Sequence, residues 1–377
     1  MNIPLSNPDI TQQEIDAVVA VLKNPQLSLG PKLLEFEKKF ARYIGAKHAV
    51  AVNSGTSGLH LCVRALDLQD GDEVLTTPFS FIASANCLLF ERARPVFVDI
   101  REDTLNIDET KLAEMINAKT KAILPVHVFG LPCTMPTIIK IAKKHHLAVI
   151  EDACEAIGAE LGGKKAGTFG DCSVFAFYPN KQITTGEGGM IVTNNDRIAV
   201  LAASMRNQGR DEGMGWLAHN RLGYNYRISD INCALGIVQL ARIEEIVNKR
   251  QQVAQLYQSA LAEIEEISLP PASSGFLKRS WFVYVIKLDR AFKQRHRDEI
   301  IRQLRAKGIG CNVYFPAIHL QPFYRKKFGY KPGDFPITES VADRTIALPF
   351  YNNLSKKGIK HVVDALKSII NQVKKHG

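Results

Sequence analysis

The pattern of apolar and polar positions predicts two helices at the start of the chain. Thr11 followed by Glu14 forms a capping box, which predicts that the first helix begins there. A second helix is predicted within 30–45, where Gly45 ends it. The apolar stripes at helical spacing are Ile15, Val18, Val19 and Leu22 in the first helix, and Leu34, Phe36, Phe40 and Ile44 in the second.

From residue 48 onward the pattern changes to short apolar runs rich in β-branched residues, separated by helical segments. This alternation predicts an α/β fold with a mainly parallel sheet whose two faces are covered by helices. The predicted strands are 48–53, 73–77, 94–100, 121–128, 147–153, 172–177 and 189–194.

The last third of the chain has a different pattern. A long helical stretch is predicted from about residue 230 to 264, and the turn-rich segment 268–275 follows it. A strand at 280–288, a basic helix at about 290–306 and a terminal helix at about 356–373 come next. We therefore predict a large sheet-containing domain at 1–245 and a small α+β domain at 246–377.

Composition and length fit a soluble protein with a deep core. The chain has 377 residues, of which 46% are hydrophobic and 23% charged, and no window approaches the roughly 18 apolar residues that a membrane span needs. The start, MNIPLSNPDI, lacks a signal-peptide pattern, so we expect a cytoplasmic protein. The seven cysteines include no close pair, which argues against a disulfide framework and against a metal site.

The net charge of +10 raises the question of a nucleic-acid partner. The basic residues are spread along the chain without a long basic block, which favours a solvated surface over a nucleic-acid face. A positive field also attracts anionic small molecules such as a sugar diphosphate.

A single lysine stands between an aromatic run and a glycine cluster in FAFYPNKQITTGEGGMIVT (175–193). The glycines follow Lys181 instead of preceding it, so the stretch is not a phosphate-binding P-loop, and no segment supplies a dinucleotide-binding fingerprint. Lys181 is a candidate for Schiff-base formation with an aldehyde, and the glycines would let the backbone approach a flat ring. A solvated surface lysine is the alternative.

Three other stretches supply partners for such a lysine. The strand at 147–153 places Glu151 and Asp152 at its carboxyl end, where ligands bind in such sheets. A carboxylate that contacts a pyridine nitrogen would keep that nitrogen protonated. The alternative is that either carboxylate only caps a helix. Gly55 and Thr56 begin a helix and offer backbone amides to a phosphate, or form an ordinary capped turn. Phe81, near a strand end, is either a ring-stacking residue or a core aromatic.

Together these stretches resemble the DegT/DnrJ/EryC1/StrS family of pyridoxal-phosphate-dependent sugar aminotransferases. The resemblance covers nearly the whole chain. Its motifs are LSLGPKLLEFEKKFARYIGAKHAVAVNSGT, GDEVLTTPFSFIASAN, PVHVFG, EDACEAIGA, GDCSVFAFYPNKQITTGEGGMIVT, LGYNYRISDINCALG, YFPAIHLQPFY and ALPFY. It implies an aspartate-aminotransferase-like fold of type I and a homodimer with active sites at the subunit interface.

The resemblance also implies roles for individual residues. Lys181 matches the Schiff-base lysine, Asp152 the pyridine-nitrogen carboxylate, Phe81 the ring-stacking aromatic, and Gly55 with Thr56 the phosphate turn. Asn225 matches an asparagine that reaches the phosphate of the neighbouring subunit's cofactor, and Tyr314 and His319 fall in a region near the sugar.

Two positions depart from the family pattern. Ala176 stands where a phosphate-binding serine is usual, which leaves one phosphate hydrogen bond to Ser173 or water. Glu155 stands where glutamine is frequent, which would alter contact with the cofactor's 3-hydroxyl or with the incoming amino group.

The function that the resemblance implies is a ping-pong transamination. L-glutamate would convert pyridoxal phosphate to pyridoxamine phosphate, which would then aminate a nucleotide-linked 4-keto or 3-keto 6-deoxyhexose. An aminocyclitol ketone or a free keto sugar is an alternative acceptor substrate that the motifs do not exclude. A sugar dehydratase on this scaffold would lack the Schiff-base lysine, and a non-catalytic regulator would have no reason to keep both Lys181 and Asp152.

Overall fold

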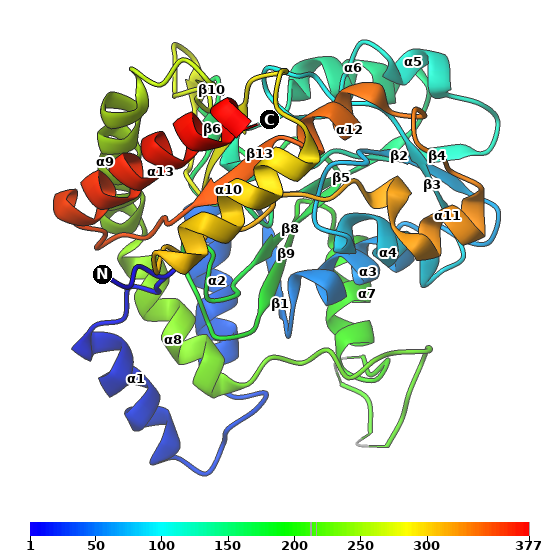
Figure 1. The fold of residues 1–377 in the computed structure, drawn as a ribbon. Helices are drawn as coiled ribbons and strands as arrows, with labels where there is room; N and C mark the ends of the chain where they lie inside the picture. Colours follow the sequence, from blue (N-terminus) through cyan, green and yellow to red (C-terminus); the bar gives the residue numbers. More distant parts are fainter. Residues whose placement is uncertain (212, 216, 377) are drawn as a thin grey trace.

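The computed structural model of the protein describes residues 1–377 except Glu212, Trp216 and Gly377. Its centre is a seven-stranded sheet of order β1-β9-β8-β5-β4-β2-β3, surrounded by helices (Figure 1). Among the described residues, no helix combines the length and the apolar character needed to cross a bilayer.

The prediction of a mainly parallel sheet is confirmed. The pairs β2·β3, β2·β4, β4·β5 and β5·β8 are parallel, whereas β9 runs antiparallel to both β1 and β8. The seven strands are β1 (His48–Val52), β2 (Glu73–Thr76), β3 (Arg94–Phe97), β4 (Thr120–Leu124), β5 (Ala148–Asp152), β8 (Cys172–Ala176) and β9 (Gly189–Thr193). The strands predicted at 94–100 and 121–128 end early, at Phe97 and Leu124.

Both faces of the sheet are covered, as the apolar strands predicted. Side chains that alternate along a strand point to opposite faces. On β8 and β9, Val174 and Ile191 pack with helices α3 (Gly55–Ala65) and α7 (Asp196–Arg206). Phe175 and Met190 pack on the other face with α2 (Pro31–Ile44) and α8 (Asp230–Ala241). The carboxyl end of β5 and the start of α3 therefore share one side of the sheet.

The first helix, α1 (Gln12–Leu22), begins at the predicted capping box, where the main-chain N–H of Thr11 donates to Glu14 Oε2 at 2.8 Å. Its apolar stripe is largely uncovered, because Ile15, Val19 and Leu22 are all exposed within the single chain. In Figure 1, α1 lies away from the central sheet. This stripe is therefore not part of the chain's own core.

In α2 the apolar stripe is shifted by one residue at its start. Leu33 is buried at 4% exposure, whereas the predicted Leu34 is 66% exposed. Phe36, Phe40 and Ile44 are buried as the spacing predicted. Gly45, with a φ of 83°, provides the left-handed C-cap that ends the helix.

The single long helix predicted at 230–264 is wrong. Two helices occupy the stretch, α8 (Asp230–Ala241) and α9 (Ile243–Leu261), and they meet at Arg242. The Arg242 guanidinium donates to Glu14 Oε1 at 2.7 Å and pairs with Asp9 Oδ1 at 3.3 Å. These bonds to the N-terminal segment fix the direction of the chain where the helix is interrupted.

The C-terminal part forms a second, smaller α+β layer. Strands β10 (Ile267–Ser268), β12 (Tyr284–Leu288) and β13 (Thr345–Leu348) make an antiparallel sheet, which packs with α9, α10 (Gln294–Ala306) and α13 (Lys356–His376). The boundary predicted at 245 and 246 falls inside α9 and stays a prediction. The remaining elements are α4 (Ala83–Leu89), α5 (Leu112–Met115), η1 (Val128–Gly130), α6 (Met135–Lys144), β6 (Glu160–Leu161), β7 (Lys164–Lys165), β11 (Leu277–Lys278), η2 (Ile318–Leu320), α11 (Pro322–Phe328) and α12 (Pro336–Ala342).

An ionic network joins the central sheet to this second layer. Glu102, just after β3, pairs with Lys287 at 3.4 Å, with Arg344 at 3.1 Å and with Arg290. The hydrogen bond from Arg290 lowers the pKa of Glu102 to about 2, although partial burial opposes this. Because the folded-state pKa is depressed, the network stabilises the protein above the ordinary carboxyl pKa, and this contribution is lost as pH falls toward about 2.

We expect Glu102→Gln to lower the free energy of unfolding at pH 7 by about 1 kcal/mol, because solvent screening limits such partly exposed networks. The difference between variant and wild type should shrink as the pH falls below about 4.5, and urea unfolding at several pH values measures it. Glu299→Gln is the matched control, since Glu299 pairs with Arg302 within α10 and this pair does not link the two layers. An equal loss in both variants, or no loss in Glu102→Gln, would contradict the role of this network.

Candidate functional site

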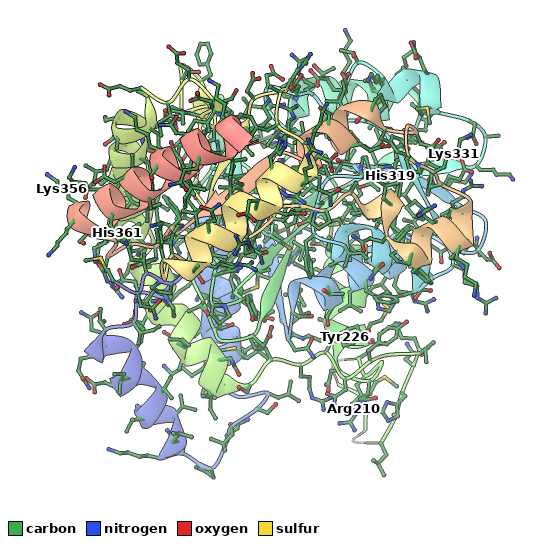
Figure 2. The ribbon with its side chains drawn as sticks, viewed as in Figure 1. Arg210, Tyr226, His319, Lys331, Lys356 and His361 are labelled. Carbon is green, nitrogen blue, oxygen red and sulfur yellow. The ribbon has the colours of Figure 1, made fainter. Side chains whose placement is uncertain are left out.

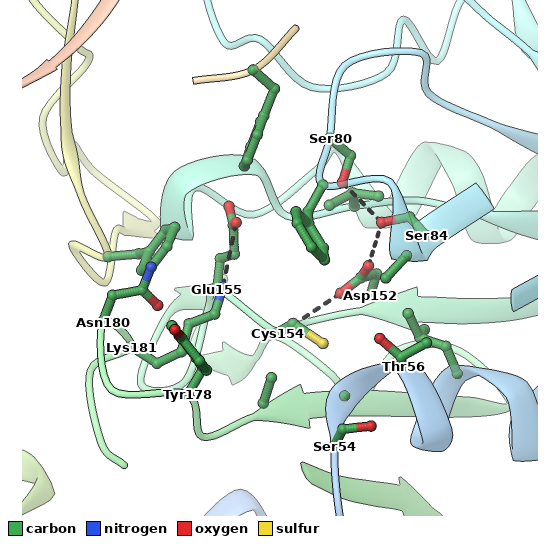
Figure 3. A pocket seen from close by; sticks show the side chains of 18 of the residues that line it. Ser54, Thr56, Ser80, Ser84, Asp152, Cys154, Glu155, Tyr178, Asn180 and Lys181 are labelled. Atoms are coloured by element: carbon green, nitrogen blue, oxygen red, sulfur yellow. Dashed lines mark hydrogen bonds and ion pairs between the residues drawn. The ribbon is translucent and has the colours of Figure 1, made fainter. Parts of the chain in front are cut away.

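A cavity of about 500 Å³ opens where the carboxyl end of β5 faces the start of α3 (Figure 3). Seven of the nine site residues predicted from the sequence line it, so the sheet brings together motifs that lie far apart in the chain. They are Gly55, Thr56, Phe81, Asp152, Glu155, Lys181 and Tyr314.

The two acidic residues at the end of β5 have separate tasks. Asp152 faces the cavity, where its Oδ2 accepts from Ser84 Oγ at 2.6 Å and its Oδ1 accepts from the Cys154 main-chain N–H at 3.1 Å (Figure 3). Glu151 points to the other side of the sheet, where it binds His127 Nε2 at 3.0 Å and the main-chain N–H of Gly167 at 2.8 Å. The segment 153–159 that follows contains no helix, so neither carboxylate is a simple helix cap.

Lys181 lies in the wall of the cavity. Its side chain is only 13% exposed, which excludes the alternative of a solvated surface lysine. The main-chain N–H of Lys181 donates to the Tyr178 carbonyl at 2.9 Å, in the turn after β8. Its Nζ lies 3.9 Å from the centroid of the Phe282 ring and 3.5 Å from Glu155 Oε1.

Glu155 is the buried partner of this lysine. Its Oε2 accepts from the main-chain N–H of Phe129 at 2.8 Å, while its Oε1 faces Lys181. Burial raises the pKa of the Glu155 carboxyl above its ordinary value, and the charge of Lys181 opposes that rise. The carboxylate therefore depends on these two partners to remain charged.

The start of α3 forms a tight turn at the cavity. Ser54 caps the helix by accepting from the Ser57 main-chain N–H at 3.1 Å. A Cβ atom on Gly55 would lie 2.8 Å from Ala176 Cβ, so only glycine lets α3 approach β8 this closely. The first N–H groups of a helix have no partner within it, and here Gly55 and Thr56 present them at the cavity.

Ser173 does not take over from the serine that Ala176 replaces. It lies three residues from Ala176 on β8 and therefore on the opposite face of the sheet. Its buried hydroxyl donates to the Gly167 carbonyl at 2.7 Å. The expectation that Ser173 supplies the missing phosphate bond is wrong.

Two aromatic residues face the cavity in different ways. Phe81 is 60% exposed and lines the cavity, which excludes the alternative of a core aromatic. The Tyr314 hydroxyl accepts from Asn180 Nδ2 at 3.3 Å. Burial, with a smaller contribution from the charge of Glu155, raises the pKa of Tyr314 to about 12, so the phenol stays protonated and can donate a hydrogen bond.

The structure does not bring His319 and Asn225 to this cavity. His319 lies near α11 and α12 (Figure 2). It is fully buried, its Nε2 binds Glu339 Oε1 at 3.0 Å and its ring packs against Phe335. Asn225 is exposed on the segment that pairs with Asn207, outside the cavity lining. Its predicted contact with a neighbouring subunit stays a prediction.

Several residues at the cavity have no counterpart in the sequence-based prediction. Ser84 holds Asp152, Phe282 covers Lys181, and Asn180 binds Tyr314. Ser84 and Asn180 lie inside motifs that the resemblance uses, so their positions in those motifs were an available signal. Phe282 comes from the strand region of the second layer, and nothing in its local sequence indicates the cavity.

Within the part of the chain that the structure describes, no group of three or more histidine, cysteine, aspartate or glutamate side chains could hold a metal ion. The polar groups of the cavity instead suit an organic molecule that carries an anionic group at one end and a basic nitrogen at the other.

Comparisons with known proteins agree with this geometry. The family model described as the DegT/DnrJ/EryC1/StrS aminotransferase family matches residues 8–367. The GDP-perosamine synthase of Caulobacter vibrioides is 37% identical over 370 residues, which cover 98% of each chain.

Solved structures give the same result. PseC of Helicobacter pylori, an aminotransferase involved in the biosynthesis of pseudoaminic acid, superposes with a TM-score of 0.92 at 30% identity and covers 99% of this chain and 100% of its own. A putative sugar aminotransferase from Streptococcus pneumoniae, in its PMP form, reaches a TM-score of 0.94 at 26% identity with the same coverage. Both confirm the predicted aminotransferase fold.

Proposed function

This chain belongs to the DegT/DnrJ/EryC1/StrS aminotransferase family, and from that premise we propose that it transfers an amino group from L-glutamate to a nucleotide-linked keto sugar. It is a sugar aminotransferase that depends on pyridoxal phosphate. The donor, the exact sugar and the role of each residue are parts of the proposal. The observation that carries it is the single cavity shared by Lys181, Asp152 and the start of α3.

The residues of the cavity fit pyridoxal phosphate. Gly55 and Thr56 would present helix N–H groups to a phosphate, and the exposed side chain of Phe81 at the cavity could stack on a flat aromatic ring. Asp152 supplies a carboxylate for the ring nitrogen, and Lys181 supplies the amine that binds the aldehyde. The approach of α3 to β8, which excludes any Cβ on Gly55, places these N–H groups beside the cavity.

The protein's own groups then have distinct tasks. The cofactor, when bound, withdraws electrons from a carbanion on the attached substrate. Lys181 Nζ would remove the proton from the amino-bearing carbon of the donor, and it would deliver a proton to the carbonyl carbon of the acceptor when that carbon gains its amino group. Ser84 and the Cys154 main-chain N–H hold Asp152 with one hydrogen bond to each oxygen, which fixes the carboxylate plane. Phe282 covers the lysine and limits the access of water.

The proposed acceptor is a nucleotide-linked 4-keto or 3-keto 6-deoxyhexose. The Caulobacter relative is named for a GDP-linked product, GDP-perosamine. The net charge of +10 on this chain would attract the diphosphate of such a substrate. Tyr314 and Asn180 supply neutral polar groups at the cavity for sugar hydroxyls. An aminocyclitol ketone or a free keto sugar is the alternative acceptor, and it would not need the positive field.

We also propose a homodimer with shared active sites. The uncovered apolar stripe of α1 supports this, because exposed apolar patches mark interaction surfaces. The position of Asn225 outside the cavity of its own chain fits a residue that serves a neighbouring subunit.

The test is a pair of half-reactions followed by absorbance. Protein that holds pyridoxal phosphate should be converted to the pyridoxamine form by L-glutamate with release of 2-oxoglutarate. Protein loaded with pyridoxamine phosphate should return to the aldehyde form with a nucleotide keto sugar from a panel that includes free keto sugars and an aminocyclitol ketone. Conversion by an unlinked ketone alone would replace the proposed substrate class. Failure of both half-reactions would favour a non-catalytic regulator.

A further inference from the structure

A buried ion pair in the cavity has no task in the reaction as proposed so far. Lys181 Nζ and Glu155 Oε1 lie 3.5 Å apart, with side chains only 13% and 6% exposed (Figure 3). Removing a carboxylate from water costs free energy unless partners repay it, and an uncharged side chain would avoid the cost. We therefore expect the charge at position 155 to have a function.

Glu155 is held from behind by a fixed main-chain segment. Phe129 donates its N–H to Glu155 Oε2 at 2.8 Å, and its carbonyl accepts from Arg279 Nε at 3.2 Å and Nη2 at 3.0 Å. Arg279 is itself buried at 3% exposure and lies over the Trp281 ring. This support leaves Oε1 as the carboxylate oxygen that faces the lysine.

The surroundings of the pair favour a charged amine. The Phe282 ring presents its face to Lys181 Nζ, and a cation is attracted to an aromatic face at this distance. The titratable and charged groups around the pair and in the same cavity are Asp152, Cys154, Tyr178, Glu187, Tyr314 and Arg279. Of these, Asp152 is bound to Ser84 and Cys154, and the Tyr314 phenol is neutral, so Glu155 is the carboxylate in contact with the amine.

We propose that Glu155 is the docking group for the ε-amine of Lys181 whenever that amine is not bonded to the cofactor, and that its negative charge stabilises the protonated amine. The proposal rests on the proposed transaminase role of Lys181. In each half-reaction the Nζ lone pair takes up one proton and later returns it, so no net proton is gained or lost. A carboxylate beside Nζ stabilises the state in which the lysine carries that proton and keeps the amine in one place between the two transfers.

The experiment uses protein loaded with pyridoxamine phosphate, because Lys181 is then a free amine. The rate at which an amine reagent labels Lys181 is measured against pH by mass spectrometry, in wild type and in Glu155→Gln. We expect the pH midpoint of labelling to fall by about one unit or more in Glu155→Gln, since the uncharged amide stabilises the ammonium less. An unchanged midpoint would overturn the proposal.

Two further variants separate charge from structure. Glu155→Asp keeps the charge and should retain most of the wild-type midpoint, whereas a midpoint equal to that of Glu155→Gln would count against a role of charge. Glu187→Gln removes another cavity carboxylate, one that makes no contact with Lys181 in the described part of the chain, and should leave the midpoint unchanged. A shift in Glu187→Gln equal to that in Glu155→Gln would contradict a specific pair.

Thermal unfolding and pyridoxamine phosphate affinity, measured on the same samples, verify that each variant is folded and loaded. The labelling readout requires no keto sugar. If the half-reactions with keto sugars fail while the midpoint still shifts, the proposed substrate is wrong and the docking role stands. If the half-reactions succeed without a shift, the docking role is wrong and the proposed function stands.

Discussion

Lys181→Ala should lower kcat by about 10³-fold or more, because Lys181 is proposed to form the Schiff base and to move the proton, and no other lysine among the described residues lines the cavity. The variant should still bind pyridoxamine phosphate, since Asp152, Phe81 and the start of α3 are held by elements that do not depend on the lysine. Steady-state kinetics measure the loss, and absorbance measures the bound pyridoxamine phosphate.

Lys278→Ala is the matched control. Lys278 is exposed and pairs with Glu160 on a small peripheral sheet, so its loss should leave the rate unchanged. If Lys181→Ala turned over at the wild-type rate, Lys181 would not have the proposed role. The same conclusion would follow if borohydride treatment of the holoenzyme left Lys181 unmodified, as judged by peptide mass spectrometry.

Asp152→Asn should lower kcat by about 10²- to 10³-fold, the usual cost of removing one preorganised electrostatic group from an active site. The amide is nearly isosteric with the carboxylate, so packing is preserved. The negative charge that is proposed to hold a proton on the ring nitrogen is lost. Affinity for the cofactor should fall as well, which equilibrium dialysis measures directly.

Ser84→Ala separates the charge of Asp152 from its orientation. The variant keeps the carboxylate but removes the 2.6 Å hydrogen bond to Oδ2, while the Cys154 main-chain N–H still holds Oδ1. We expect a loss of about 10-fold or less, because a single orienting hydrogen bond contributes about 1 kcal/mol. Equal losses in Ser84→Ala and Asp152→Asn would mean that orientation, and not charge, is the contribution of Asp152.

Much of the architecture follows from local patterns. The seven strands and the mainly parallel direction of their pairing could be predicted because β-branched runs alternate with helical segments. The helical stretch from 230 was predicted as one helix because neither glycine nor proline interrupts it near Arg242. Its break depends on ion pairs with Asp9 and Glu14, more than 200 residues away, which no local pattern contains.

Local sequence patterns were also insufficient to predict how residues are arranged in the site. The local pattern placed two carboxylates at one strand end, and only the family resemblance selected Asp152 over Glu151. The pattern alone could not make that choice, because it depends on which face of the sheet carries α3. Adjacent leucines at 33 and 34 presented the same problem in α2, where a rotation of one residue decides which of them is buried. Phe282 reaches the cavity only through the packing of the second layer on the first, so it has no local signal at all.

The cavity takes its walls from both ends of the chain, with Thr56 and Asp152 from the first half and Phe282 and Tyr314 from the last third. A pocket assembled in this way exists only in the fully folded protein, so pyridoxal phosphate binds the native state and not the unfolded one. By mass action, each tenfold excess of free cofactor over its Kd adds about 1.4 kcal/mol to the free energy of unfolding. The lifetime of the protein against proteolysis is thereby tied to the supply of vitamin B6.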